Sequence, residues 1–441
     1  MKRKIITVGL AAAIGVASFA PQISAVTVDP NTRACLAKKY GPQVADKIAA
    51  SKKLTATQTK QLASCKTSSG GASSPSTSGG STTSASLKAL NYSLLWSVGS
   101  QQAGLGNVSD PALLQLADGT LRMFFKNGNE PQIPISGFDN KIHSYVSRDN
   151  GATWTLESGV RIDVGSPVSV RVADSGGYEA WGWVPAAGGD ALTRFTSTDG
   201  STFAAQSGTA VPTSACKNAN GAAAGFLGDA QVVKIAGGYL AYAHDLAAGK
   251  NAPFKRQACK LTSTTGTSWS VDATGTIALD YDIVNNPELY RNASGQLELL
   301  LPIDNAGSHY IDVRTSTNDG ASWTSAGTIP LNIADPERLD LANGTSLLAF
   351  GNFDHTIGGL LAVAKKVTSP YSASRDEKVD STTWTVSGAK TSDVKVKNLC
   401  KGTDVTSAAK IATSGSNLTV TYSASSVGCV YLVLGSSNIL G

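Results

Sequence analysis

The sequence predicts an all-β fold, a five-bladed β-propeller with a small helical hairpin before it and a small β domain after it. Two phrases, each repeated along the chain at intervals of roughly fifty residues, predict the propeller. One phrase is a hairpin corner and the other begins an apolar strand. The four corners are Ser147–Trp154, Ser197–Phe203, Ser263–Trp269 and Ser316–Trp323.

Each corner combines a small hydroxyl residue, a cluster of turn-forming residues and an aromatic residue that follows at a nearly fixed distance. Asp, Asn and Gly favour the backbone geometry of tight turns, and an aromatic ring can fold back over such a turn. We therefore expect each corner to join the third and the outermost strand of a four-stranded sheet.

The second phrase opens on a polar residue, usually before proline, and runs into two apolar strands around a short turn. The starting positions are 56, 63, 57 and 49 residues apart, which is enough chain for a four-stranded antiparallel sheet each time. The five copies begin at Asp110, Ser166, Asp229, Asn286 and Asp335.

The fifth unit ends its third strand near Leu360–Val367 and supplies no fourth strand. The apolar segment Ser93–Val98, which precedes the first copy, can fill that place and close the ring. Closure would remove exposed strand edges, which invite aggregation. We expect five blades, with six as the alternative.

The chain divides by composition into five segments. Residues 1–25 read as an export signal, with basic Lys2, Arg3 and Lys4 before an apolar run; an uncleaved anchor is the alternative. Residues 26–66 predict a disulfide-stapled helical hairpin, whose second helix Thr55 or Thr57 can cap. A Gly/Ser/Thr linker spans 67–86, the propeller 87–368 and a β-sandwich-like domain 369–441.

The charge is unevenly distributed. The formal net charge is +5; residues 1–25 contribute +3 and residues 26–66 contribute +6, which leaves −4 for the rest. We therefore expect no nucleic-acid groove in the propeller, and a basic hairpin that either serves as a spacer or contacts an anionic envelope polymer. We expect a monomer that is secreted, periplasmic or held at the cell surface.

The six cysteines agree with export. They fall into three couples that are close in sequence, and no Cys/His spacing is typical of zinc. We expect structural disulfides, no metal and no cofactor. The expected couples are Cys35 with Cys65, Cys216 with Cys259, and Cys400 with Cys429.

Acidic residues stand at the starts of the innermost strands, which converge on the axis of a propeller. Paired carboxylates can cleave a glycosidic bond, one protonating the leaving oxygen and the other attacking or activating water. The candidate catalytic residues are Asp110, Asp229 and Glu288, and the candidate substrate-binding residues are Asp335, Glu337, His244, Asp245, Trp181 and Trp183. Each also has a structural alternative: strand-starting residues for the acids, a loop hydrogen bond for the histidine and core packing for the tryptophans.

The corners resemble the Asp box, or BNR repeat, of the sialidase superfamily, in which Ser-x-Asp-x-Gly-x-x-Trp recurs. Ser147–Trp154 matches every fixed position, whereas Ser316–Trp323 has Asn318 in place of the aspartate. The resemblance covers about 87–368 and implies a propeller. Sialidases of this family bind the substrate carboxylate with three arginines, and the phrase that would hold the first reads Val108-Ser109-Asp110-Pro111 here. The chain is therefore not expected to be a true sialidase.

An Asp-Pro phrase at the first innermost strand resembles instead the five-bladed glycoside hydrolases that include arabinanases, xylosidases and fructosidases. This resemblance implies that Asp110 is the base or nucleophile and that Asp229 stands near the position of the general acid, where the family has glutamate. A second-blade carboxylate is expected near Ser166, and Asp163 is the nearest acid. We expect either a glycoside hydrolase that acts on glycans or polysaccharides, or a non-catalytic surface propeller that binds a carbohydrate or a protein.

Overall fold

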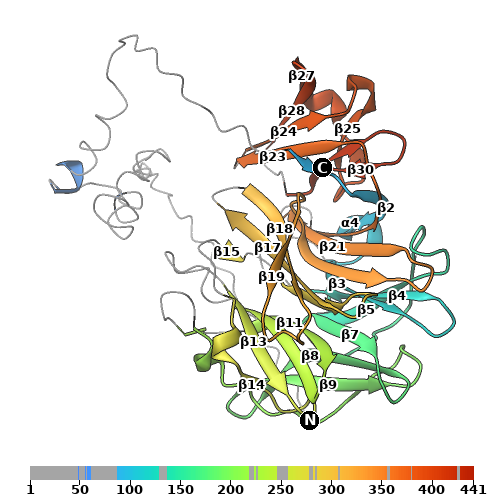
Figure 1. Cartoon of the computed structure of the whole chain (residues 1–441), viewed down its shortest axis with the longest axis vertical. Helices are drawn as coiled ribbons and strands as arrows, with labels where there is room; N and C mark the ends of the chain where they lie inside the picture. Colours follow the sequence, from blue (N-terminus) through green and yellow to red (C-terminus); the bar gives the residue numbers. More distant parts are fainter. Residues whose placement is uncertain are drawn as a thin grey trace, which may run out of the picture. The chain divides into compact units, whose positions relative to one another are not determined.

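The computed structural model describes residues 48, 55, 57–60, 87–128, 137–217, 223–224, 227–245, 257–277, 282–283, 286–305, 308–354, 358–378, 380–424 and 428–441 (Figure 1). The chain forms two compact units, Met1–Ser84 and Ala85–Gly441. The predicted signal peptide, the linker over 67–86, Cys35 and Cys65 lie outside the described residues. No helix among the described residues is long and apolar enough to span a membrane.

One predicted helix cap is visible in the first unit. The backbone N–H of Gln58 donates to Thr55 Oγ1 at 3.2 Å, and the backbone N–H of Thr55 donates to Gln58 Oε1 at 2.8 Å. This reciprocal pair is a capping box, and helical residues 57–60 follow it. Of the two threonines predicted to cap this helix, the structure uses Thr55.

Five antiparallel sheets form the body of the second unit, and each begins with an innermost strand. The first sheet holds β3 (Ser109–Gln115), β4 (Leu121–Asn127), β5 (Lys141–Ser147) and β6 (Thr155–Leu156). The second holds β7 (Val168–Val172), β8 (Tyr178–Ala186), β9 (Gly189–Ser197) and β10 (Ala204–Ala205). The third holds β11 (Leu227–Ile235), β12 (Gly238–Asp245), β13 (Ala258–Ser263) and β14 (Ser270–Val271).

The fourth and fifth sheets follow the same order. The fourth sheet holds β16 (Glu288–Arg291), β17 (Leu297–Asn305), β18 (Ser308–Ser316) and β19 (Thr324–Ile329), and β15 (Asp282–Ile283) also pairs with β17. The fifth sheet holds β20 (Ala334–Asp340), β21 (Ser346–Asp354), β22 (Gly358–Lys366) and β2 (Tyr92–Gly99). Figure 1 shows these sheets as successive groups of arrows along the colour bar. We number the sheets one to five in this order.

The innermost strands form a closed ring. Contacts run from β3 to β7, β11, β16 and β20, and from β20 back to β3. The ring closes through the chain ends as predicted, because β2 pairs antiparallel with β22 and supplies the outermost strand of sheet five. An all-β propeller is therefore confirmed as the fold class.

The hairpin corners lie between the third and fourth strands of sheets one to four. In each corner the backbone N–H of the glycine donates to the hydroxyl of the first serine, at 2.8–3.0 Å. In the first corner Ser147 Oγ also donates to Asp149 Oδ1 at 2.8 Å, and the Trp154 indole donates to the Gly151 carbonyl at 3.0 Å. These local bonds explain why the corner phrase recurs.

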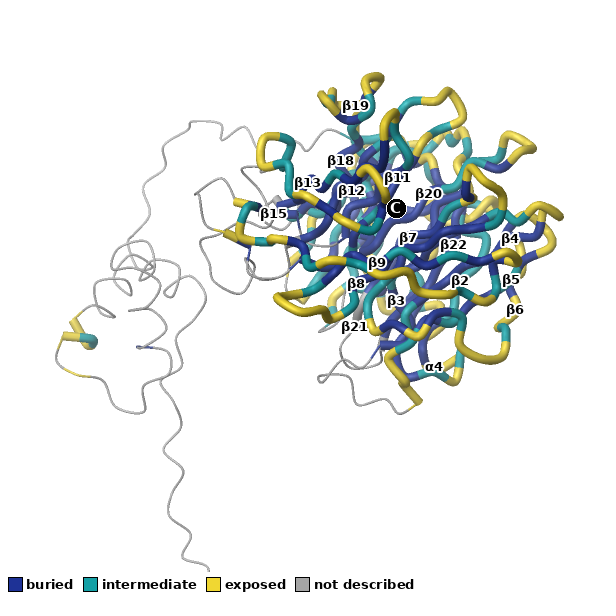
Figure 2. The backbone as a smooth tube through the Cα atoms, turned by 90° about the horizontal axis from the view of Figure 1, so that it is seen from below, coloured by how far each residue is buried: buried dark blue, intermediate teal, exposed yellow. Residues whose placement is uncertain are grey.

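The apolar core lies between neighbouring sheets, and Figure 2 shows the buried strands as a continuous dark region inside exposed turns. Sheets two and three, for example, enclose a cluster that includes Trp181, Leu192, Leu261 and Trp269. Similar clusters join sheets one and two, three and four, four and five, and five and one. The rigid ring that results fixes where the innermost strands point.

The segment after the propeller forms two packed β layers. One layer holds β1 (Lys88–Ala89), β23 (Ser372–Lys378), β24 (Ser381–Ser387), β28 (Asn417–Ser423) and β27 (Ala409–Ser414); the other holds β30 (Ile439–Leu440), β29 (Val430–Leu434), β25 (Val394–Asn398) and β26 (Thr403–Asp404). The strand β1 belongs to this module although it precedes the propeller in sequence. A core that includes Trp384, Val396, Val420 and Leu432 lies between the layers.

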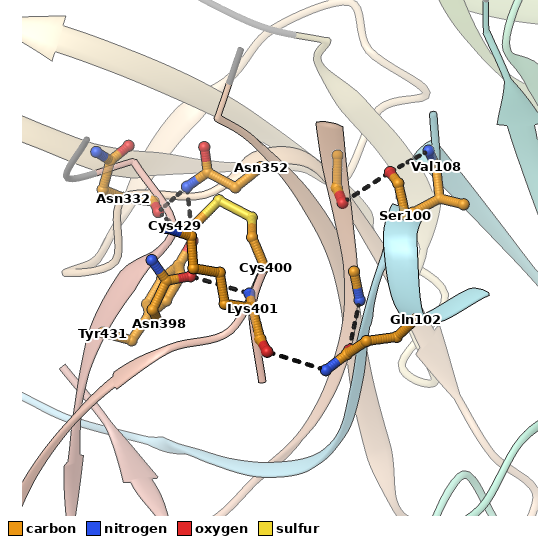
Figure 3. The surroundings of a disulfide bond; sticks show 12 residues. Ser100, Gln102, Val108, Asn332, Asn352, Asn398, Cys400, Lys401, Cys429 and Tyr431 are labelled. Atoms are coloured by element: carbon orange, nitrogen blue, oxygen red, sulfur yellow. Dashed lines mark hydrogen bonds between the residues drawn. A yellow bond between two sulfur atoms is a disulfide. The ribbon is translucent and has the colours of Figure 1, made fainter. Parts of the chain in front are cut away.

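This module is continuous with the propeller, because β30 pairs with β2 and extends sheet five. Figure 3 shows a second junction, beside the disulfide between Cys400 and Cys429. There the Tyr431 hydroxyl donates to the Asn332 carbonyl at 2.8 Å, and Gln102 of the short helix α4 (Ser100–Ala103) donates to the Lys401 carbonyl at 3.2 Å. The disulfides Cys400–Cys429 and Cys216–Cys259 are both confirmed.

Candidate functional site

Three aspartates occupy one position in sheets one, three and five. The backbone φ angles are 53° at Asp110, 51° at Asp229 and 49° at Asp335, in the left-handed region that non-glycine residues seldom adopt. In each case the pairing of the innermost strand with its neighbour shifts register across the aspartate. A β-bulge of this kind changes the direction in which a side chain points, and residues with strained backbone angles are often found at functional sites.

The three aspartates lie close together at the end of the propeller axis where the innermost strands begin. We call this end the start side. Burial of Asp335, and then the negative charges of Asp110 and Asp229, raise the pKa of Asp335 well above its usual range. A hydrogen bond with Asp110 raises the pKa of Asp335 further, whereas the backbone N–H of Asn286 lowers it. Asp335 therefore holds its proton to a higher pH than an ordinary aspartate does.

The fourth sheet contributes an amide to this cluster. Asn286, at the equivalent position, donates from Nδ2 to Asp110 Oδ1 at 2.8 Å, and Ser109 Oγ donates to Asp110 Oδ2. Space here is limited: a cavity of about 10 Å³, room for about one water molecule, lies among Asp110, Asp335, Asn286 and Gln231. A Cβ atom on Gly351 would stand 3.2 Å from Asp335 Oδ2, so glycine leaves room for this carboxyl group.

Two glutamates form a second layer, two residues further along the strands. Glu288 and Glu337 are 2% and 5% exposed, and the backbone N–H of Leu113 donates to Glu337 Oε1 at 3.0 Å. Burial raises the pKa of Glu288 to about 7, and burial together with the charge of Glu288 raises the pKa of Glu337 well above its usual range. The two carboxyl groups hydrogen-bond to each other, which requires a shared proton.

A larger pocket opens where the innermost strands end, which we call the finish side. It has a volume of about 690 Å³, and Glu288 and Glu337 line it. Gln231 lines both this pocket and the small cavity of the start side. Near the opening stand Arg171, Lys234 and Arg291, each five residues after the start of its repeated phrase.

The structure divides the predicted acids between these two layers. Asp110, Asp229 and Asp335 gather at the start side, whereas Glu288 pairs with Glu337 deeper along the axis. Asp110 and Glu288 had both been predicted as catalytic, but a two-residue offset along the strands separates their layers. Asp163, the acid nearest the expected second-blade position, has a side chain that is 79% exposed and forms an ion pair with Lys141 at 3.1 Å.

The other predicted residues lie elsewhere. His244 is 1% exposed and its Nε2 lies 2.9 Å from the Ile283 carbonyl oxygen. It stands within β12 and not in the loop that the structural alternative had assumed. Trp181 is fully buried and donates to the Gly266 carbonyl at 2.8 Å, and Trp183 is 6% exposed in the same core. Packing between sheets therefore leaves neither ring a face for a sugar, in contrast to the prediction. Asp245 ends β12, and its side chain lies outside what the structure describes.

Sequence reasoning missed Asn286 as the partner of Asp110, and it missed the finish-side pocket. The signal for both was present in the five aligned phrases. Asn286 stands where the other sheets have Asp or Ser, and a basic residue recurs at the sixth position of three consecutive phrases. The sequence-based prediction used the first three positions of each phrase, so it did not include these basic residues.

The arrangement at the start side supplies a proton-bearing carboxyl group beside carboxyl groups from other sheets. Such environments can separate acid and base roles among chemically identical groups. The described residues contain no cluster of three His, Cys, Asp or Glu side chains suited to hold a metal ion.

Comparisons with known proteins find similar structures at low identity. No protein-family model matches the chain, and no curated protein matches it. A protein of unknown function from Dyadobacter fermentans is 14% identical, with 76% of this chain and 99% of that chain covered and a TM-score of 0.41. An α-L-arabinanase from Penicillium chrysogenum is 12% identical (64% and 99% covered, TM-score 0.39). The catalytic domain of a GH62 α-L-arabinofuranosidase from Coprinopsis cinerea is 12% identical (62% and 97% covered, TM-score 0.43).

These similarities are too weak to transfer an activity to this chain. The propeller assignment depends on the ring of strands.

Proposed function

We propose that the start side of the axis is the active site of a glycoside hydrolase that acts on a neutral glycan. The observation that carries the proposal is the convergence of Asp110, Asp229 and Asp335, each on the same left-handed bulge of a different sheet. Neutral substrates are favoured because clustered carboxyl groups would repel an anionic sugar.

The separation that glycosidases need between their two carboxyl groups supports different roles for the three aspartates. The acid and the base or nucleophile of a glycosidase stand at least about 5 Å apart, so two carboxyl groups that share a hydrogen bond cannot fill both roles. Asp335 hydrogen-bonds to Asp110, and the pair therefore acts as one unit. We assign attack or water activation to Asp110, oriented by Asn286, and proton donation to the leaving oxygen to Asp229.

The raised pKa of Asp335 supports this division. A neutral Asp335 adds no negative charge beside Asp110, and it can donate a hydrogen bond that holds the Asp110 carboxylate in one orientation. Loss of that proton would place two repelling charges side by side.

A release assay tests the proposal. The full chain would be incubated with a panel of neutral plant and envelope polysaccharides, and new reducing ends would be measured. We expect Asp110→Asn and Asp229→Asn each to lower release by about 100-fold or more, because positioned acid and base groups contribute rate factors of that size. Asp163→Asn, an exposed acid on the surface, is the matched control and should keep full release.

A second candidate is a propeller without catalysis that binds a carbohydrate or a protein. It is favoured by the tight packing around Asp335, because a cavity of about 10 Å³ leaves no room for a sugar ring beside the aspartates. Binding of a glycan by the wild-type protein without release, unchanged in Asp229→Asn, would select this candidate and reject hydrolysis.

We also propose that the protein is exported and acts as a monomer. The two disulfides of the second unit and the signal-like first 25 residues support export. The net charge of the segment 26–66 supports contact with an anionic envelope polymer.

A further inference from the structure

The finish-side pocket has the size of a small-molecule site. Its volume of about 690 Å³ lies within the range of about 300–1,000 Å³ that ligand pockets occupy. The last halves of innermost strands from all five sheets line it. It is distinct from the aspartate cluster, since Gln231 is the one residue that lines both cavities among the described residues.

The floor of the pocket presents two carboxyl oxygens in need of a donor. Glu337 Oε1 is occupied by the backbone N–H of Leu113, and Glu337 Oε2 and Glu288 Oε2 are both buried. Neither Oε2 atom meets an N–H or O–H donor from another described residue, so the two depend on a single proton between them. A primary ammonium group carries three donors and a positive charge, and it can satisfy both oxygens in place of that proton.

The opening of the pocket carries three basic residues, with Asp340 also at its edge. Arg171, Lys234 and Arg291 come from three consecutive sheets and stand at the same position of the phrase. Arg171 contacts Asp174 at 2.6 Å, and Arg291 contacts Asp319 at 2.8 Å. The Lys234 ammonium lies 4.2 Å from the centre of the Tyr239 ring, and it forms no ion pair within the described part of the chain.

The spacing between these two groups sets the length of a ligand. Of the described innermost strands, β16 holds both groups. Three residues separate Glu288 from Arg291 along it, which is about 10 Å at a rise of about 3.3 Å per residue. An extended tripeptide covers a similar length between its amino and carboxyl ends. Between the two groups the wall is apolar, with Leu113, Val232 and Leu289 among the lining residues.

We propose that the finish-side pocket binds a short peptide-like zwitterion, with its ammonium group between Glu288 and Glu337 and its carboxylate at the basic opening. On binding, the proton shared by the glutamates leaves to solvent and the ammonium takes its place. An apolar middle residue contacts the wall. This site is independent of the glycan chemistry proposed for the start side.

Isothermal titration calorimetry of the full chain with Ala-Leu-Ala tests the proposal. The free peptide should bind, and the N-acetylated and the C-amidated peptides should each bind at least about tenfold more weakly. Equal affinity for the free and acetylated peptides, or no heat of binding with any of the three, would overturn the proposal.

Two variants sharpen the test. Glu337→Gln should abolish the preference for the free amino group, and Lys234→Met should abolish the preference for the free carboxylate. Lys141→Met, an exposed lysine paired with Asp163, is the matched control and should bind like the wild type. Thermal melting establishes that each variant is folded, and the comparison of the three peptides on the wild-type protein stands even if a variant fails to fold. A preference for free termini that survives in both variants would also overturn the site.

Discussion

The two sides of the propeller axis share the same five strands but differ in charge and in space. The start side gathers three aspartates on left-handed bulges around a cavity of about 10 Å³. The finish side has a pocket of about 690 Å³, with a carboxyl pair at its floor and basic residues near its opening. The three aspartates and the pocket of about 690 Å³ therefore lie on opposite sides of the axis.

The difference follows from the repeated phrase itself. Its first position begins the strand, where a bulge turns the aspartate toward the axis; its third position holds Glu288 and Glu337; its sixth position reaches the opposite opening. One sequence repeat thus builds two environments because it runs along the axis from one side to the other.

The largest effect on stability should come from a substitution in the core between sheets, because that core supports both sides of the axis. Trp181→Ala removes a fully buried indole between sheets two and three, and we expect a loss of about 3–5 kcal/mol in the free energy of unfolding. Chemical denaturation measures it, with Phe138→Ala, a ring that is 44% exposed, as the control. A loss below about 1 kcal/mol would contradict the placement of Trp181 in the core and restore it as a sugar platform.

A smaller effect should appear in the pH dependence of stability. The pKa values of Asp335, Glu337 and Glu288 are all raised in the folded protein, that of Glu288 to about 7, whereas the unfolded chain releases these protons near the ordinary values of 3.8 and 4.5. Because the folded state binds more protons, this contribution to the free energy of unfolding is complete below about pH 4 and falls as the pH rises through 7.

Denaturation between pH 5 and pH 8 separates the two sides. Asp335→Asn should remove the start-side part of the decline, and Glu337→Gln the finish-side part. A wild-type stability that rises over this range, or a decline that both variants leave intact, would show that these carboxyl groups are not the cause.

The smallest effect should be confined to one side. Asn286→Ala removes the hydrogen bond to Asp110, and we expect glycan release to fall about tenfold, which corresponds to about 1.4 kcal/mol. Peptide binding at the finish side should not change. A parallel loss of both activities would mean that Asn286 supports the ring as a whole.

The fold could be predicted largely from the sequence because its repeats are local. The hydrogen bonds of each corner phrase form between residues close in sequence, and each strand phrase has its own apolar pattern. The closing strand at Ser93–Val98 could be predicted because the fifth repeat has no fourth strand of its own. The identity of the acids at the axis was also predictable, since each phrase begins with a polar residue at the same place.

What could not be predicted depends on side-chain direction and on neighbours far away in sequence. The alternation of Trp181 and Trp183 places both on one face but does not say whether that face meets a core or a pocket. The two-residue offset that separates Glu288 from Asp110 matters only once bulges at Asp110, Asp229 and Asp335 are known. The amide of Asn286 reaches Asp110 across 176 positions of sequence, which no local pattern encodes.

We expect carboxyl groups on both sides of the axis to hold protons at neutral pH, because burial raises the pKa of Asp335, Glu288 and Glu337. Infrared difference spectroscopy of the full chain at pH 7 detects protonated carboxyl groups directly. We expect such a signal in the wild-type protein, reduced in part by Asp335→Asn, in part by Glu337→Gln, and by the sum of both in the double variant. Absence of the signal, or a signal that neither variant reduces, would contradict the account.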